Sequence, residues 1–184
     1  MEFCKIEKIK DGRYLKNYEL TYLNKAGKEK KYEIVSRKEL RKTEDLGAKS
    51  SGVSIVIRRE GELLLLREFR MGINRKVFNL VAGMIEEDET IEDCVRRELY
   101  EETGLELVKI TSVLPASFAA VAISDIKTQI VFAEARGIMV DYHTSDNEQI
   151  EAQFYTKEEV RILLETEEFS SRAQIVAHFF ANEW

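Results

Sequence analysis

The sequence is poor in cysteine, and this scarcity excludes two ways of stabilising a small fold. Cys4 and Cys94 are the only cysteines among 184 residues, and no CxxC or Cys/His cluster is present. A structural zinc site and a disulfide framework therefore have no support, and we expect a reducing, cytoplasmic compartment. The charged N-terminal segment also lacks the apolar stretch of a signal peptide, so none is expected.

Long apolar runs and an excess of basic charge are also missing. The longest nearly apolar run, residues 112–123, is too short to span a bilayer and contains Pro115, so no membrane role is expected. The chain has 28 Lys and Arg against 34 Asp and Glu, a net charge of −6. Such a balance gives no fold-wide attraction to nucleic acid. Acidic side chains can still gather locally around a divalent cation, which can in turn hold phosphate.

The beginning of the chain predicts a small β unit. Tyr18, Leu20 and Tyr22 alternate with polar residues, which is the periodicity of a strand. Residues 24–27 read as a turn and residues 31–36 as the returning strand, so a hairpin is expected. A lone hairpin is marginally stable in water, and this unit should therefore pack on something else.

The polar stretch 41–52 is the best domain boundary. We therefore divide the chain into an N-terminal β-hairpin unit, residues 1–46, and a main domain, residues 47–184. In the main domain, apolar runs predict strands at 53–58, 63–68, 77–81, 108–113, 128–135 and 150–155. Helices are expected at about 90–103, 156–166 and 171–182. Strands mixed with a few helices predict an α/β or α+β sandwich rather than a regular βαβ repeat.

The helix expected near residues 90–103 has clear end signals. Thr90 can cap its start, with Asp93 three residues later, and Gly104 stands where a helix-ending glycine is expected. Its apolar stripe recurs at helical spacing, at Ile91, Val95 and Leu99.

Three carboxylates share one face of this helix. Glu98, Glu101 and Glu102 are three and four positions apart, so their like charges are neighbours and repel. Hard oxygen ligands at this density suit Mg²⁺, with Mn²⁺ as the alternative. Arg97 can pair with Glu101 and orient it. A charge run of this kind can also be an ordinary solvated helix face, and only the spacing of the whole segment favours the metal site.

Two residues before the helix complete the pattern. Glu89, near the helix start, gains from the helix dipole and can brace the preceding loop. Gly83 permits a backbone turn that a side chain would block.

The full spacing is Gly83, five residues, Glu89, seven residues, Arg97-Glu98-Leu99, one residue, Glu101-Glu102, one residue, Gly104-Leu105. This segment resembles the Nudix box at every specified position. Residues 66–70 and 80–86 extend the likeness, so the chain is similar to the ADP-ribose pyrophosphatase branch of the Nudix hydrolases. The resemblance implies a Nudix α/β/α sandwich with a mixed sheet, preceded by a small N-terminal β unit. It also implies homodimers, since members of the branch commonly exchange such N-terminal units.

The same resemblance assigns the metal site. It implies that Glu98, Glu101 and Glu102 bind Mg²⁺, that the backbone carbonyl of Ala82 completes part of the shell, and that Arg97 orients the carboxylates. Gly83, Glu89 and Gly104 would be structural members of the box.

The resemblance also suggests substrate contacts. Arg70 would lie near the substrate phosphates or the terminal ribose, and Arg37 is a second candidate from the N-terminal unit. Ser124 and Asp125 occupy the loop where the branch often carries a Pro-Gly pair and then an acidic residue. In this chain the Pro is missing, and Ile126 stands at the place of that acid. Asn79 stands where branch members often carry Glu.

An acid on a late loop often assists catalysis in this branch. Asp146 and Glu148 match its place, and either would accept a proton or bind a further metal, unless the segment is an ordinary acidic loop.

The leading hypothesis is hydrolysis of the diphosphate of ADP-ribose to AMP and ribose 5-phosphate. A pyrophosphatase for another nucleotide sugar or nucleoside diphosphate derivative is the first alternative. A nucleotide-binding module without catalysis is the second, although binding alone does not require a crowded carboxylate site. The expected partner is a small-molecule nucleotide.

Overall fold

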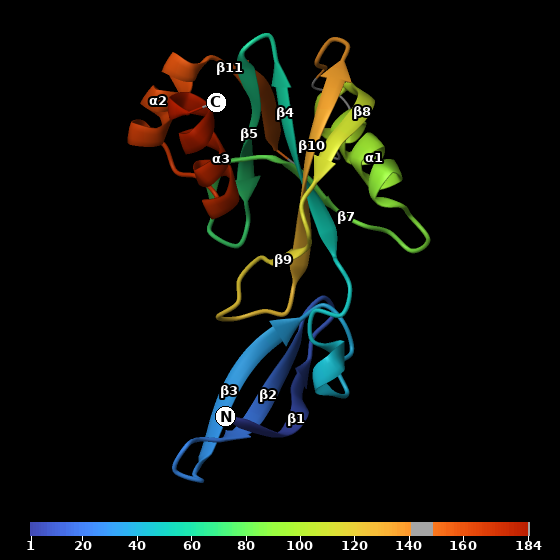
Figure 1. Ribbon diagram of the computed structural model, residues 1–184, viewed down its shortest axis with the longest axis vertical. Helices are drawn as coiled ribbons and strands as arrows, with labels where there is room; N and C mark the ends of the chain where they lie inside the picture. The colour runs from blue at the N-terminus through green and yellow to red at the C-terminus, as the bar shows by residue number, and fades with distance from the viewer. Residues whose placement is uncertain (141–148, 184) are drawn as a thin grey trace. The chain divides into compact units, whose positions relative to one another are not determined.

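The structure, a computed structural model, describes residues 1–140 and 149–183 (Figure 1). The chain divides into two compact units. The first contains Met1–Ser51 and Ala116–Thr128, and the second contains Gly52–Pro115 and Gln129–Trp184. The domain limits expected from the sequence, 1–46 and 47–184, stay predictions.

The first unit is built on a three-stranded antiparallel sheet in the order β1-β2-β3. Its strands are β1 (Glu2–Asp11), β2 (Lys16–Leu23) and β3 (Glu29–Ser36). The predicted hairpin is present as β2 and β3, but β1 was not expected because charged residues interrupt its apolar positions. Tyr18 and Leu20 lie on the buried face, where they form a small core with Ile34 and Leu40.

A segment distant in sequence completes the first unit. β9 (Ser117–Phe118) pairs with Lys127 and Thr128, the first residues of β10 (Lys127–Arg136). The backbone nitrogen of Val35 donates to the carbonyl of Ile123 at 2.8 Å. The loop that carries the predicted contacts Ser124 and Asp125 is therefore part of this unit. A short 3-10 turn, η1 (Thr43–Asp45), precedes the end of its first segment.

The second unit has a sheet whose main strands run in the order β11-β5-β4-β10-β8, with β6 paired to β5 and β7 paired to β4. Its elements are β4 (Gly52–Arg59), β5 (Glu62–Arg70), β6 (Arg75–Asn79), β7 (Val81–Met84), α1 (Ile91–Thr103), β8 (Glu106–Val113), the rest of β10, β11 (Ile150–Tyr155), α2 (Lys157–Thr166) and α3 (Ser171–Asn182). The single run expected at 77–81 is divided, since β6 and β7 follow different neighbours.

Helices cover both faces of this sheet. Figure 1 shows α1 on one side and α2 and α3 on the other. Because side chains alternate along a strand, β5 supplies both cores. Leu64 and Leu66 pack in the α1 cluster, while Leu63 and Leu65 pack in the α3 cluster. Both clusters consist of fully or nearly fully buried apolar side chains, which is the main stabilising contribution of this layered unit.

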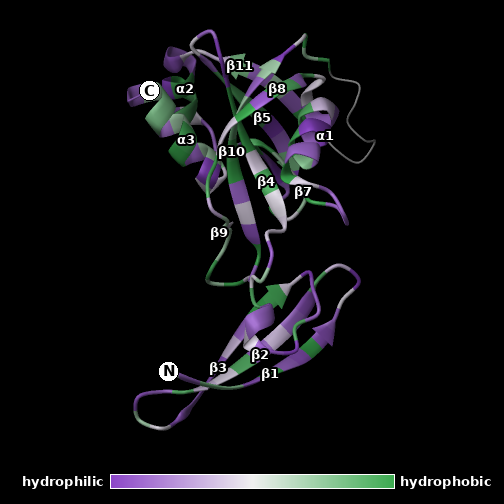
Figure 2. Cartoon of the chain, turned by 45° about the vertical axis from the view of Figure 1, so that its right-hand side comes forward, coloured by the Kyte–Doolittle hydropathy of each residue, from purple (hydrophilic) through white to green (hydrophobic). Residues whose placement is uncertain are grey.

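Helix α1 is amphipathic, as its sequence predicts. Val95 and Leu99 are completely buried against the sheet, and Figure 2 colours most of the rest of the helix as hydrophilic. One face of α1 therefore anchors the helix, and the other is available for polar chemistry. Within residues 1–140 and 149–183, no helix combines the length and apolarity that a membrane crossing needs.

Candidate active site

The ends of α1 are fixed by local sequence. The Thr90 hydroxyl accepts a hydrogen bond from the backbone nitrogen of Asp93 at 3.1 Å, which caps the helix. Gly104 has φ of 74° and donates to the carbonyl of Tyr100 at 2.8 Å. A Cβ at Gly104 would lie 2.2 Å from Val140 Cγ2. Left-handed geometry and the close contact both favour glycine there.

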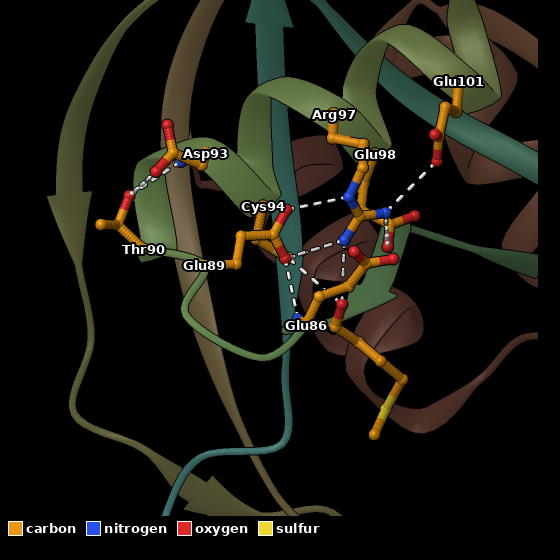
Figure 3. A network of polar contacts seen from close by, with 9 residues as sticks. Glu86, Glu89, Thr90, Asp93, Cys94, Arg97, Glu98 and Glu101 are labelled. Carbon is orange, nitrogen blue, oxygen red and sulfur yellow. Dashed lines mark hydrogen bonds and ion pairs between the residues drawn. The ribbon is translucent and has the colours of Figure 1, made fainter.

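Arg97 is the centre of a dense polar network on α1 (Figure 3). Its Nε and one terminal nitrogen lie 2.8 and 2.9 Å from the two Glu89 oxygens, a bidentate pair. The other terminal nitrogen lies 2.7 Å from Glu98 and 3.3 Å from Glu101. The carbonyl of Met84 accepts a further bond at 3.0 Å. The Arg97 guanidinium thus joins α1 to β7 at Met84 and to the loop that carries Glu89.

The network changes the acidity of its members. The bidentate bond to Arg97 holds the pKa of Glu89 at about 2, and a bond from the backbone nitrogen of Glu86 at 2.9 Å adds to this. The same carboxylate raises the pKa of Arg97 above its usual value. Glu89 therefore stays ionised and closes the loop between Glu86 and α1.

Glu98 occupies the space that the missing side chain of Gly83 leaves open. A Cβ built on Gly83 would lie 1.6 Å from Glu98 Oε1, so no other residue fits while Glu98 keeps this position. Burial raises the pKa of Glu98, although Arg97 acts in the opposite direction. The carboxylate is held against backbone, in an environment where a nearby cation would favour its charged form.

Glu102 and Glu101 differ in how they are held. The backbone nitrogen of Ala82 donates to Glu102 Oε2 at 3.1 Å, which ties the C-terminal half of α1 to β7. β7 is itself anchored because Ala82 and Gly83 pair with Ser54 and Val53 of β4. The Glu101 side chain is 52% exposed, and its contact with Arg97, at 3.3 Å, lies at the helix surface. The structure thus brings all the box residues into one region of the second unit.

The donor set fits a hard divalent cation. Three carboxylates and the Ala82–Gly83 backbone lie along one edge of α1, and the cradle exists because Gly83 has no Cβ. Across the described residues, however, no three acidic, Cys or His side chains already converge as metal ligands. The carboxylates instead contact Arg97 and the Ala82 nitrogen, and their ligand roles stay predictions.

Cys94 lies on the buried side of the same network. It is completely buried, and burial raises the pKa of its thiol to about 12. Its sulfur donates to the Met84 carbonyl at 3.6 Å. Cys94 is therefore a small core residue next to the strand that precedes the box loop.

Arg70 stands at the end of β5, on the face that α1 covers. It alternates with Leu66 and Glu68, and its side chain is 59% exposed. Its guanidinium donates to Glu68 at 3.3 Å. The opposite oxygen of Glu68 accepts from Asn79 at 2.6 Å. The sequence reasoning missed Glu68, for which the available signal was a carboxylate between the apolar run 63–66 and Phe69.

The remaining predicted residues lie elsewhere. Arg37, Ser124 and Asp125 belong to the first unit, where Arg37 is exposed and the other two are buried. Asp125 accepts from the backbone nitrogen of Gly47 at 3.2 Å, and Arg37 and Asp125 line a common cavity of about 350 Å³. Asp146 and Glu148 lie outside the described residues.

Known proteins resemble the chain in sequence and in fold. The NUDIX domain model matches residues 48–179. An ADP-ribose pyrophosphatase of Bacillus subtilis is 27% identical over 110 residues, which are 59% of this chain and 59% of that protein. A NAD-capped RNA hydrolase NudC of Vibrio parahaemolyticus is 36% identical over 58 residues, 32% of this chain and 22% of that protein. The chain thus spans less than two thirds of the length of either relative.

Among solved structures, a crystal structure of an ADP compounds hydrolase superposes with a TM-score of 0.72 and 21% identity, covering 99% of this chain and 92% of the other. At this identity the likeness concerns the fold. It confirms the expected fold class, an α/β sandwich with a mixed sheet preceded by a small N-terminal β unit.

Proposed function

The chain belongs to the NUDIX family, and from this premise we propose that it is a Mg²⁺-dependent hydrolase of the diphosphate bond of ADP-ribose. The products are AMP and ribose 5-phosphate. The observation that carries the proposal is the placement of Glu98 in the cradle of Gly83, with Glu101 and Glu102 beside it and Arg97 behind.

A divalent cation, when bound, supplies charge neutralisation of the diphosphate and activation of a water. Glu98, Glu101 and Glu102 hold it together with the carbonyl of Ala82, and Mn²⁺ is the alternative to Mg²⁺. Anionic oxygen donors of this kind are what both ions prefer.

Other side chains orient the carboxylates, bind the substrate and accept a proton. Arg97 orients Glu98 and Glu101, because its donors are directed to carboxylates and to the Met84 carbonyl. Arg70 binds the substrate phosphates or the terminal ribose, since its side chain is 59% exposed and carries an anion-binding guanidinium. Asp146 or Glu148 accepts the proton of the attacking water. Arg37, Ser124 and Asp125 contact the rest of the nucleotide.

The substrate choice rests on the relatives. A pyrophosphatase for ADP-ribose and a hydrolase of NAD-capped RNA both act on molecules that contain an adenosine diphosphate, so other nucleotide sugars and NAD are the alternatives. We also propose a homodimer formed through the N-terminal unit and a cytoplasmic location. Light scattering at micromolar concentration tests the dimer, and a monomer there would contradict it.

The test is direct product analysis. The purified protein is incubated with ADP-ribose, two other nucleotide sugars or NAD, with Mg²⁺ or with EDTA, and the nucleoside monophosphate that is released is quantified by chromatography. We expect Mg²⁺-dependent release of AMP, fastest from ADP-ribose. Reaction in ¹⁸O-labelled water then identifies the attacked phosphorus from the product that carries the label.

Each outcome has a distinct meaning. Faster cleavage of another compound keeps the hydrolase and changes the substrate. Absence of turnover with every diphosphate, while ADP-ribose still binds by calorimetry, favours the binding module. For Glu→Gln variants of the proposed metal ligands, Glu92→Gln is the matched control. It removes one carboxylate from the exposed side of α1, where Glu92 pairs with Arg96.

A further inference from the structure

A row of four polar side chains crosses the second unit beside the box. The Ser170 hydroxyl donates to Asn79 Oδ1 at 2.6 Å, Asn79 Nδ2 donates to Glu68 Oε1 at 2.6 Å, and Arg70 donates to Glu68 Oε2 at 3.3 Å. Ser170 is also the N-cap of α3. The row therefore runs from the start of α3 through β6 and β5 to Arg70.

Glu68 is the ion on which this row depends. It is 6% exposed and lies inside the sheet, where its backbone is paired with Val77 of β6 and Ile150 of β11. A buried carboxylate requires partners for its oxygens. Asn79 provides one and Arg70 provides the other. Because each oxygen has a different donor, the carboxylate is fixed in rotation.

The identity of Asn79 determines how strongly Arg70 is held. The Asn79 amide is neutral, so Arg70 is the cation that pairs with Glu68 in this row, and Arg70 faces the single negative charge of Glu68. A carboxylate at position 79 would stand within hydrogen-bond distance of Glu68, and two such acids cannot both be ionised without a strong mutual repulsion. Arg70 would then face up to two negative charges instead of one.

We propose that Asn79 is a positioning residue that sets the orientation and the available charge of Arg70 through Glu68. The inference rests on the proposed function in one respect, that Arg70 meets the substrate. A guanidinium has five N–H donors, and Glu68 engages only one edge of it. The Arg70 side chain is 59% exposed and, among the described residues, is held by Glu68 alone, so it can receive an anionic oxygen. With an amide at position 79, Arg70 is ordered by Glu68 and faces one negative charge rather than two.

The test compares two Asn→Asp changes that add the same charge. Asn79→Asp places a carboxylate against Glu68, whereas Asn74→Asp adds one in the turn between β5 and β6, where the left-handed φ of 54° tolerates aspartate. We expect Asn79→Asp to raise KM for ADP-ribose about tenfold with kcat within about twofold, equivalent to one tenfold step in affinity. Asn74→Asp should leave both unchanged.

A second variant keeps the test informative if Asn79→Asp is unstable. Glu68→Gln has nearly the same shape and buries no charge, and it removes the ion that orders Arg70. We expect the same rise in KM with kcat largely retained. A fall in kcat alone, or equal KM values for Asn79→Asp and Asn74→Asp, overturns the proposal.

A measurement without substrate separates this inference from the proposed function. The NMR signal of the Arg70 terminal guanidinium nitrogens, assigned by its loss in Arg70→Lys, reports the ion pair, because a terminal nitrogen is the donor to Glu68. We expect it to shift in Asn79→Asp and to broaden or lose order in Glu68→Gln, and to stay unchanged in Asn74→Asp. An unchanged signal in both test variants refutes the role of Asn79 whether or not the protein hydrolyses ADP-ribose. A shifted signal in a protein that cleaves no diphosphate rejects the proposed function and leaves the Asn79–Glu68–Arg70 coupling established.

Discussion

Arg97 and Arg70 stand in the same unit and have opposite surroundings. Arg97 is 26% exposed and contacts three carboxylates and a carbonyl. Arg70 is 59% exposed and, within residues 1–140 and 149–183, its guanidinium pairs with Glu68 alone. The donors of the Arg97 guanidinium are directed to acceptors within the protein. The Arg70 guanidinium is held at one edge and is otherwise open, so the two arginines are suited to orienting the site and to binding an anion, respectively.

The largest expected effect concerns two of the proposed metal ligands. Glu102→Gln and Glu101→Gln should each reduce kcat/KM for ADP-ribose by about 10³-fold, roughly 4 kcal/mol in the barrier, because an amide is a poor ligand for Mg²⁺. The fold should persist, since a glutamine oxygen at position 102 can still accept from Ala82. Circular dichroism and steady-state kinetics check this. Full activity of the double variant would exclude the metal site.

The next prediction separates the two arginines by stability. Arg97→Ala should lower the free energy of unfolding by about 3 kcal/mol, because Glu89 and Glu98 are left largely buried without their cation. Arg70→Ala removes a single bond of 3.3 Å to Glu68, which still accepts from Asn79, so it should cost less, about 2 kcal/mol, but it should raise KM. Urea unfolding with parallel kinetics measures both. Equal losses of unfolding free energy in Arg97→Ala and Arg70→Ala would contradict the different roles given to the two arginines.

Acid titration refines the account of Arg97. The folded state holds the pKa of Glu89 at about 2, below its ordinary value of 4.5, so it favours the ionised form. Its stabilising contribution is therefore complete above pH 4.5 and is lost as the pH falls toward 2. The unfolding free energy of the native protein should fall more steeply across this window than that of Glu89→Gln. Parallel curves would show that Glu89 is not held as described.

The smallest effect concerns the start of α1. Thr90→Ala removes the acceptor for the Asp93 nitrogen and should cost about 1 kcal/mol of stability. Catalysis should be unchanged at temperatures where the protein is folded, since the Arg97 contacts lie further along the helix. A thermal melt and one activity assay are sufficient, and a selective loss of kcat would show that the cap also sets the site.

The sequence predicted the parts of the fold that local chemistry decides. Helix α1 begins after Thr90 and ends at Gly104, where the cap signals place it, and α3 spans Ser171–Asn182 as expected. Thr156 and Glu159 form a capping box at the start of α2, which lies within the helix expected at 156–166. These features depend on residues a few positions apart, so a single sequence is sufficient to find them.

Features that depend on distant partners were not predictable in this way. β1 carries too many charges to read as a strand, and it forms because β2 offers an edge. Residues 116–128 complete the first unit through contacts with β3, and no local pattern indicates this. The box spacing likewise located the carboxylates, but not the bidentate bond of Arg97 to Glu89, eight residues away. That bond follows from the path of the loop after Gly83.

The burial of Cys94 makes the molecule convenient to label. A thiol reacts with maleimides as its thiolate, and a pKa of about 12 leaves almost none of that form near neutral pH. Cys4 is exposed on β1. One dye per chain should therefore attach to the unmodified protein, on the first unit, without any engineered cysteine. Two molecules that share their N-terminal units would then bring two dyes together, and their energy transfer would follow assembly in real time.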